Sequence, residues 1–160
     1  TAEQSINGSL SGPMLRASSV DWDIRKSNPY EIYDKLNFEV PIGKNGDVFD
    51  RYLVRIKEMR ESLKIIGQCV DMISEGPVRA DVPYNIRPPA GDIYSSIEAP
   101  KGELGFYLVS DQSISPYRCK IRSPSFMNLS LLREMLVGWK MSDLIVILGS
   151  VDFVMGEVDR

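Results

Sequence analysis

The 160-residue sequence contains no histidine and only two cysteines, Cys69 and Cys119. Catalysis by a Ser-His-Asp triad or a Cys-His pair built within this chain is excluded, because both need an imidazole base. Two isolated thiols also cannot supply the four ligands of a zinc or iron–sulfur site. Such cysteines are typical of a protein from a reducing compartment, and we expect both to be small core residues.

Long apolar runs and an excess of one charge are missing as well. The longest apolar run covers residues 144–148, far below the roughly 20 residues of a membrane-spanning helix. The net charge is −3 and basic residues are mixed with acidic ones, so a nucleic-acid-binding role has little support. The length and the 43% hydrophobic content suit one domain, residues 1–160, with its own core.

Helix signals dominate residues 1–76. Thr1 and Gln4 have the spacing of a capping box, which predicts a short helix over residues 1–7. A helix cap at the first residue suggests that further residues precede Thr1 in the complete polypeptide. A second short helix is predicted to open at residues 11–13.

The next two predicted elements are a helix and an edge strand. Asn28 is a preferred cap and Pro29 suits the first helical position, so a helix is predicted over residues 28–36. Apolar residues then alternate with other residues over 38–42, which predicts a short strand. Pro41 places this strand at a sheet edge.

The clearest element is a long amphipathic helix that ends before Gly76-Pro77. Its apolar residues are spaced alternately by three and four positions, which aligns them in one stripe. We interpret the stripe as facing the core, and the opposite, charged face as solvated or paired with a partner subunit. The stripe consists of Phe49, Tyr52, Ile56, Met59, Leu63, Ile66, Val70 and Ile73.

The second half of the chain adds β-structure, so the predicted fold class is α+β. A proline-rich loop over residues 77–92 precedes alternating patterns that predict a small antiparallel sheet over 93–122. Two helices follow within 123–149, and residues 150–160 form an unusually apolar tail. We expect this tail to be buried, either in an interface or docked on its own domain.

Eight motifs are spread in order along the chain: SGPMLRAS (11–18), VDWDIRK (20–26), NPY (28–30), GD (46–47), DRYLVR (50–55), EAPKGELG (98–105), YRCKIR (117–122) and MGEVDR (155–160). Together they resemble the motifs of one family, the 49-kDa subunit of respiratory complex I, the NADH:quinone oxidoreductase. That family is related to the large subunit of nickel–iron hydrogenases. The resemblance is to its C-terminal half, and it implies the corresponding part of the hydrogenase-large-subunit-like fold.

The resemblance implies a role in reducing ubiquinone. Asp152, Phe153, Val154 and Met155 would line or shape the quinone cavity, and Arg160 would lie near the neighbouring subunit that carries the terminal iron–sulfur cluster. The nickel-binding cysteines of the hydrogenases are missing from this terminus, so no metal is expected here. No residue is assigned a catalytic role, and the isolated chain is expected to be inactive.

Two departures from the family pattern shape these expectations. The part of the family that carries a histidine-containing loop and a tyrosine for the quinone headgroup is missing, so this chain resembles half of a split subunit or a fragment. Its partners would be the chain with the other half, the cluster-bearing subunit and other peripheral-arm subunits. The family also usually carries an amphipathic helix between the proline-rich loop and the sheet. This chain lacks that helix, so its region over residues 81–92 is shorter than in the family.

The resemblance implies a place in a proton-translocating NADH:ubiquinone reductase, in the peripheral arm on the matrix side of the mitochondrial inner membrane. One alternative is a structural or assembly scaffold that retains the fold without a direct quinone role. Another is an independent hydrolase based on Asp152, which lies between Val151 and Phe153 and could have a raised carboxyl pKa in an apolar pocket.

Overall fold

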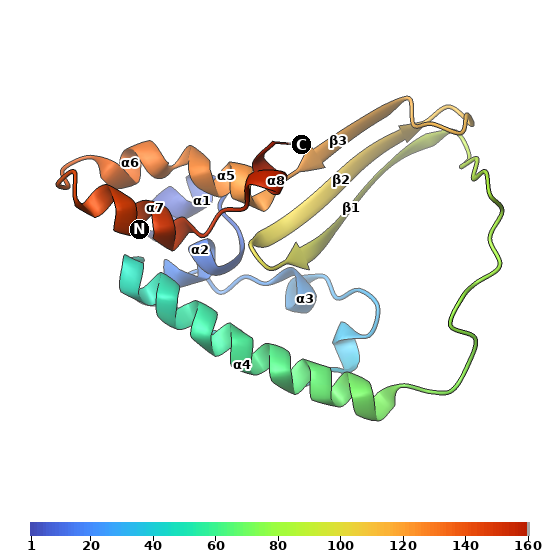
Figure 1. The fold of residues 1–160 in the computed structure, drawn as a ribbon, viewed down its shortest axis with the longest axis horizontal. Coiled ribbons are helices and arrows are strands. Elements are labelled where there is room, and N and C mark those ends of the chain that lie inside the picture. Colours follow the sequence, from blue (N-terminus) through green and yellow to red (C-terminus); the bar gives the residue numbers. More distant parts are fainter. Residues whose placement is uncertain (160) are drawn as a thin grey trace.

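The computed structural model describes residues 1–159 and shows a cluster of helices beside a small antiparallel sheet (Figure 1). The α+β prediction is confirmed. No helix in the described part of the chain is long and apolar enough to cross a membrane. The elements are α1 (Ala2–Asn7), α2 (Gly12–Ala17), α3 (Ile24–Ser27), the 3₁₀ helix η1 (Tyr33–Lys35), α4 (Val48–Met72), β1 (Gly91–Ala99), β2 (Gly102–Ser110), β3 (Arg118–Arg122), α5 (Pro124–Ser130), α6 (Leu132–Leu136), α7 (Asp143–Val151) and α8 (Met155–Val158).

Helix α2 lies at the centre of the fold, and all of its residues are buried. Leu10, Met14 and Leu15 form a core cluster with Val151 at the end of α7, so the two ends of the sequence meet in the interior. Gly12 at the start of α2 has a φ of 63° and lies against the backbone of Gly102, where a Cβ would collide. This close approach joins α2 to the turn between β1 and β2.

The sheet has the strand order β1-β2-β3 with antiparallel pairing throughout, as the alternating pattern predicted. The register places Ile93 opposite Leu108, and Phe106 opposite Ile121. Apolar side chains therefore share one face of the sheet, and Ile93 is 62% exposed on it. Glu98 and Arg122 belong to the opposite, polar face, where Glu98 pairs with Arg16 of α2 and Arg122 pairs with Glu103 of β2.

The helix predicted over residues 28–36 is wrong. A short helix, α3, ends just before it, and only one 3₁₀ turn forms within it. Glu31 has a φ of 53°, which interrupts helical geometry. The ring of Tyr33 instead packs edge-on against Tyr30 and Phe38, with centroids 4.9 and 6.1 Å away, so tertiary contacts outweigh the local cap signal.

The edge strand predicted over residues 38–42 is also wrong, because no strand forms there. The backbone N–H groups of Asn37 and Glu39 donate to the side chains of Gln68 and Glu61 on α4, at 2.8 and 3.0 Å. The segment is extended, but the side chains of a helix satisfy its backbone in place of a neighbouring strand.

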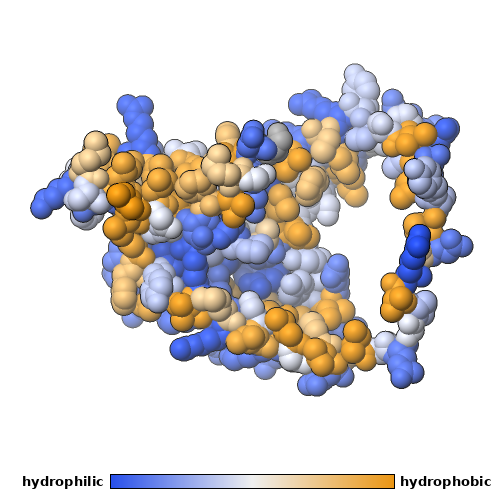
Figure 2. Space-filling view, viewed as in Figure 1, coloured by the Kyte–Doolittle hydropathy of each residue, from blue (hydrophilic) through white to orange (hydrophobic). Residues whose placement is uncertain are grey.

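The long helix α4 forms as predicted, but the predicted orientation of its apolar stripe is wrong. Leu63, Ile66 and Val70 are 69%, 57% and 65% exposed, while the fully buried residues of α4 are Arg51 and Val54. The cysteine prediction fails similarly, since Cys119 is exposed and Cys69 is half-buried. Figure 2 shows apolar surface along α4 and around α6 and α7, together with an opening framed by the end of α4, the linker over residues 73–90 and the sheet.

Candidate functional site

The candidate site is the turn that follows α7. Val151, the last residue of α7, is 2% exposed in the core. Asp152 then adopts a left-handed conformation with a φ of 58° and a ψ of 45°, and its N–H donates to the carbonyl of Gly149 at 3.2 Å. Aspartate is among the few non-glycine residues that enter this region readily. The turn reverses the chain and presents the carboxylate at the end of the helix.

Two cations from distant elements hold the Asp152 carboxylate. Lys101, in the turn between β1 and β2, donates from Nζ to Oδ2 at 2.6 Å. Arg55 on α4 places Nε 3.2 Å from the same oxygen, where it forms an ion pair without the alignment of a hydrogen bond. Within residues 1–159, these contacts all go to Oδ2. The other oxygen, Oδ1, therefore remains available as an acceptor on a side chain that is 44% exposed.

Two arginines on α4 bind the end of α7, next to the turn. Arg51 donates from Nε to Ser150 Oγ at 2.9 Å, and Arg55 donates from Nη2 to the Val151 carbonyl at 3.1 Å. Burial is the main influence on both guanidinium groups and lowers the pKa of each. The charge of Asp152 opposes that effect at Arg55. Both arginines therefore hold the end of α7, and Arg55 also pairs with the Asp152 carboxylate.

The residues beyond the turn are tied down by one buried hydroxyl. Ser125 on α5 is 1% exposed. Its Oγ donates to Glu157 Oε2 at 2.5 Å and accepts from the N–H of Val154 at 3.2 Å. A second bond runs from the Ser125 N–H to the same Glu157 oxygen at 3.3 Å. Ser125 therefore fixes the direction in which residues 153–157 leave the turn.

A groove of about 410 Å³ lies between α7 and this turn. Its walls are mostly apolar, and its acidic side chain is Asp152. The volume falls within the range of small-molecule sites, and an apolar lining with a few placed polar groups is typical of them. The lining residues are Leu144, Ile145, Leu148, Gly149, Asp152 and Phe153.

The structure thus brings two of the predicted quinone-site residues, Asp152 and Phe153, to the same groove. Val154 and Met155 do not line it and are 45% and 64% exposed. Burial of these two residues in the chain's own interior, one form of the tail prediction, is therefore wrong, while burial in an interface stays a prediction. Arg160 lies outside the described residues.

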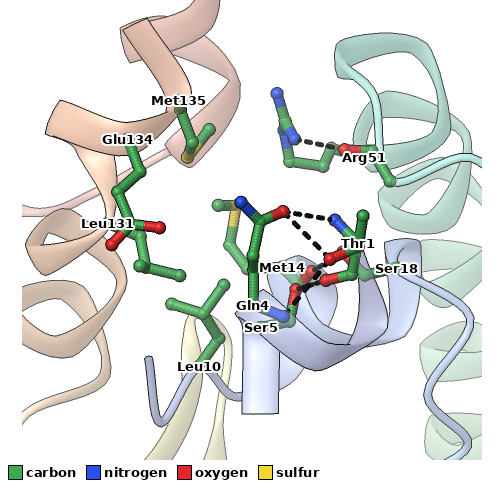
Figure 3. A pocket seen from close by; sticks show the side chains of 11 residues that line it. Thr1, Gln4, Ser5, Leu10, Met14, Ser18, Arg51, Leu131, Glu134 and Met135 are labelled. Carbon is green, nitrogen blue, oxygen red and sulfur yellow. Dashed lines mark hydrogen bonds between the residues drawn. The ribbon is translucent and has the colours of Figure 1, made fainter. Parts of the chain in front are cut away.

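A separate small pocket, shown in Figure 3, lies between α1, α2, α4 and α6. Its volume is about 100 Å³, well below the size of a typical ligand site. Gln4 Oε1 accepts from both the N-terminal amine and the hydroxyl of Thr1, at 3.1 and 2.9 Å. These polar groups satisfy one another, and the pocket contains none of the predicted site residues.

A buried charge cluster adjoins the site. The guanidinium of Arg16, 2% exposed, lies 2.8 Å from both Glu58 and Glu98 and 3.5 Å from Asp23. Burial raises the pKa of Glu98, although the charge of Arg16 opposes this, and Glu98 Oε2 has no hydrogen-bond partner among residues 1–159. Glu58 also attracts Arg55, so the cluster is linked electrostatically to the cations behind Asp152.

Asp23 behaves differently from Glu98 within this cluster. Burial acts to raise the pKa of Asp23, but a hydrogen bond from Arg25 and the charges of Arg16 and Arg25 together lower it.

Among the described residues, no group of three or more His, Cys, Asp or Glu side chains could hold a metal ion. The groove beside Asp152 can therefore bind a small apolar molecule next to a carboxylate that Lys101 and Arg55 hold in place.

Comparison with known sequences identifies the family. The profile described as the 49-kDa subunit of respiratory-chain NADH dehydrogenase matches residues 1–86 and 80–160. This chain belongs to the 49-kDa subunit family. The match in two overlapping pieces agrees with the shortened region that the sequence places over residues 81–92.

Relatives in this family are each named as one of the subunits of NADH-quinone oxidoreductase. The protein from Dehalococcoides mccartyi (strain ATCC BAA-2266 / KCTC 15142 / 195) is 56% identical over 158 residues, which cover 99% of this chain and 43% of the relative. The Desulforamulus reducens protein is 55% identical over 159 residues, with 99% and 43% covered. The Geotalea uraniireducens protein is 46% identical over 185 positions, with 100% and 47% covered.

Two consequences follow from these matches. The chain spans less than half the length of these relatives. The relatives also come from bacteria, so the mitochondrial location predicted from the resemblance has no support among them.

Sequence reasoning missed most of the residues that position Asp152 in this family member. None of Lys101, Arg55 and Ser125 was predicted to contribute to the site, although Lys101 and Arg55 lie within the quoted motifs EAPKGELG and DRYLVR. Position along the chain gave no sign that these motifs converge. Only the fold brings residues 55, 101 and 152 together.

Proposed function

We propose that this chain forms one wall of the quinone-reduction cavity of an NADH-quinone oxidoreductase. The observation that carries the proposal is the groove beside Asp152, with its carboxylate fixed by Lys101 and Arg55. Its support from the family is that the relatives are named as parts of an NADH-quinone oxidoreductase. An independent hydrolase based on Asp152 is disfavoured, because Lys101 and Arg55 both form ion pairs with its carboxylate, whereas a general acid needs a carboxyl without such partners.

The groove suits the two stages of quinone chemistry. An uncharged quinone ring packs against apolar walls such as Leu148 and Phe153. Reduction to the quinol adds two electrons and two protons, and the quinol hydroxyl then donates a hydrogen bond to Asp152 Oδ1. Lys101 and Arg55 stabilise negative charge that develops on the ring before the protons arrive.

The electrons come from outside this chain. The described residues offer no metal-binding group, and the proposal assigns the terminal iron–sulfur cluster to a neighbouring subunit. This chain then contributes position and electrostatics, while the redox chemistry belongs to the cluster and the quinone. Arg160 is proposed to face the cluster-bearing subunit, and Val154 and Met155 are proposed to become covered at that interface.

The whole complex would be a proton-translocating NADH:quinone reductase, with this chain in its peripheral arm. Its partners there would be the polypeptide with the remaining part of the 49-kDa subunit, the cluster-bearing subunit and other peripheral-arm subunits.

The test replaces Asp152 by asparagine in the assembled complex. Losing the charge removes the ion pairs that hold Lys101 and Arg55 at the groove, so this wall should be less well ordered and the KM for ubiquinone should rise about tenfold, which corresponds to ~1.4 kcal/mol. NADH oxidation by a small artificial acceptor that bypasses the quinone should be unchanged. Asp21→Asn removes the same charge from an exposed residue outside the groove and serves as the matched control. An unchanged KM and unchanged inhibitor sensitivity in Asp152→Asn would favour the scaffold role instead.

A further inference from the structure

Helix α4 is amphipathic, but its polar side faces the rest of the chain and its apolar side faces outward. This is the reverse of a surface helix in a globular protein. Arg51, Glu58 and Gln68 face the rest of the chain, where they bond Gly46 and Ser150, Arg16, and Asn37 respectively. The apolar stripe defined above faces outward, and Leu63 on it is 69% exposed. A continuous exposed apolar surface of this kind marks an interaction site.

The spacing of the stripe specifies what kind of surface covers it. Its residues repeat every seven positions without a break, in the a and d positions of a heptad, and those within α4, from Phe49 to Val70, span about 32 Å of helix. A strict seven-residue repeat keeps an apolar seam in contact with a second helix that crosses at a small angle. The a positions are Phe49, Ile56, Leu63 and Val70, and the d positions are Tyr52, Met59, Ile66 and Ile73.

The charged residues beside the stripe further restrict which kind of helix can bind it. Lys57, Arg60 and Lys64 are exposed on α4. Of these, Lys64 pairs with Glu61 within the helix. These three residues give the middle of the stripe a basic border, while Asp71 is exposed beside its end, so a helix that lies along the middle of the stripe is favoured by acidic residues on its own flanks.

The apolar surface continues past the N-terminal end of α4. Phe49 lines a hollow of about 690 Å³ together with Trp139 and Val146, which are 66% and 57% exposed. The stripe and this hollow form one face that runs from α4 to α7. A face of this extent needs more than a single short peptide to cover it.

We propose that the stripe on α4 is the docking seam for a helix from the part of the 49-kDa polypeptide that this chain does not span. The relatives are more than twice as long as the matched region, so they contain chain enough to supply such a helix. This proposal rests on the proposed function only for the identity of the partner. The heptad, the exposure and the basic border stand without it.

The experiment co-expresses this chain with the unmatched part of the Dehalococcoides mccartyi relative, as a separate polypeptide, and measures co-purification and the dissociation constant. We expect a one-to-one complex. The double change Leu63→Glu and Ile66→Glu should weaken it at least about 100-fold, because two apolar side chains are lost from the seam and two charges are placed in it. Ser115→Glu adds a charge to the exposed loop before β3, away from the stripe and the charges beside it, and should bind nearly as tightly as the wild type.

Folding of the variants is checked on the chain alone. Leu63 and Ile66 are exposed there, so the double variant should melt at the same temperature as the wild type. The proposal is overturned if the wild type does not bind or if the double variant binds as well as the wild type. It is also overturned if the stripe only pairs two copies of this chain or only binds anionic vesicles. Intact docking with an unchanged quinone KM in Asp152→Asn would refute the proposed function and leave the docking seam standing.

Discussion

Removing the guanidinium of Arg16 should unfold much of the chain population near neutral pH. Arg16 is 2% exposed and contacts Glu58 and Glu98 at 2.8 Å. Breaking a buried ion pair by deleting one partner costs about 3–5 kcal/mol, because the remaining charge stays buried without compensation. Arg16→Met leaves two carboxylates in that position, so a loss toward the upper end, about 5 kcal/mol, is expected. That is comparable to the whole stability of a small domain, about 5–15 kcal/mol.

Urea denaturation followed by circular dichroism measures this loss. Lys64→Met is the control, since it breaks an ion pair on the exposed side of α4, and it should change the midpoint little. The destabilisation by Arg16→Met should shrink as the pH falls toward 4.5, the ordinary pKa of a glutamate carboxyl, because protonation neutralises the carboxylates left without their partner. An Arg16→Met chain as stable as the wild type at pH 7 would refute this account of the cluster.

Three further predictions concern single contacts. The pKa of Asp23 is lowered in the folded chain, so its contribution to stability is present above pH 3.8 and is lost as the pH falls through the lowered value; the difference in unfolding free energy between wild type and Asp23→Asn should vanish in acid, and a constant difference would contradict the assignment. Gly102→Ala should cost at least about 1–3 kcal/mol in urea denaturation, since φ is 133° and a Cβ would collide with Ser11 Oγ; an unchanged midpoint would contradict the packing. Ser125→Ala should release residues 153–157, measured as faster amide hydrogen exchange at Val154, at a cost of about 1–3 kcal/mol; unchanged exchange would show that Ser125 does not hold the tail.

The elements set by local sequence were the ones that could be predicted. The capping box at Thr1, the extent of α4 and the three strands all depend on patterns within a few residues. The helix expected at Asn28 failed because packing of Tyr33 against Tyr30 and Phe38 competes with the cap. The strand expected after it failed because Gln68 and Glu61 supply acceptors that no local pattern reveals.

The orientation of α4 shows a different limit. Periodicity identifies an apolar face, but it does not tell whether that face meets its own domain or another polypeptide. Two hydrogen bonds instead determine which side of α4 is buried. One joins Arg51 to Ser150, and the other joins Glu58 to Arg16. Both are contacts of charged side chains with residues far away in the sequence, Ser150 and Arg16, and a sequence pattern shows such side chains only as an ordinary solvated face.

The candidate site was predictable only in part for the same reason. The resemblance pointed to residues 152–155, and the fold places Asp152 and Phe153 in one groove. The cations that hold Asp152 come from residues 55 and 101. Their convergence depends on how α4 and the turn between β1 and β2 pack against the end of α7.

The most direct test of the quinone-wall proposal is photoaffinity labelling of the assembled complex with a photoreactive ubiquinone analogue. Trypsin cleaves after Lys140, so the groove and the tail fall in one peptide, residues 141–160. The account predicts that this peptide is labelled at residues 152–155 or on the facing side of α7, and that excess ubiquinone suppresses the label. Labelling that ubiquinone suppresses in other subunits, with none in residues 141–160, would contradict it.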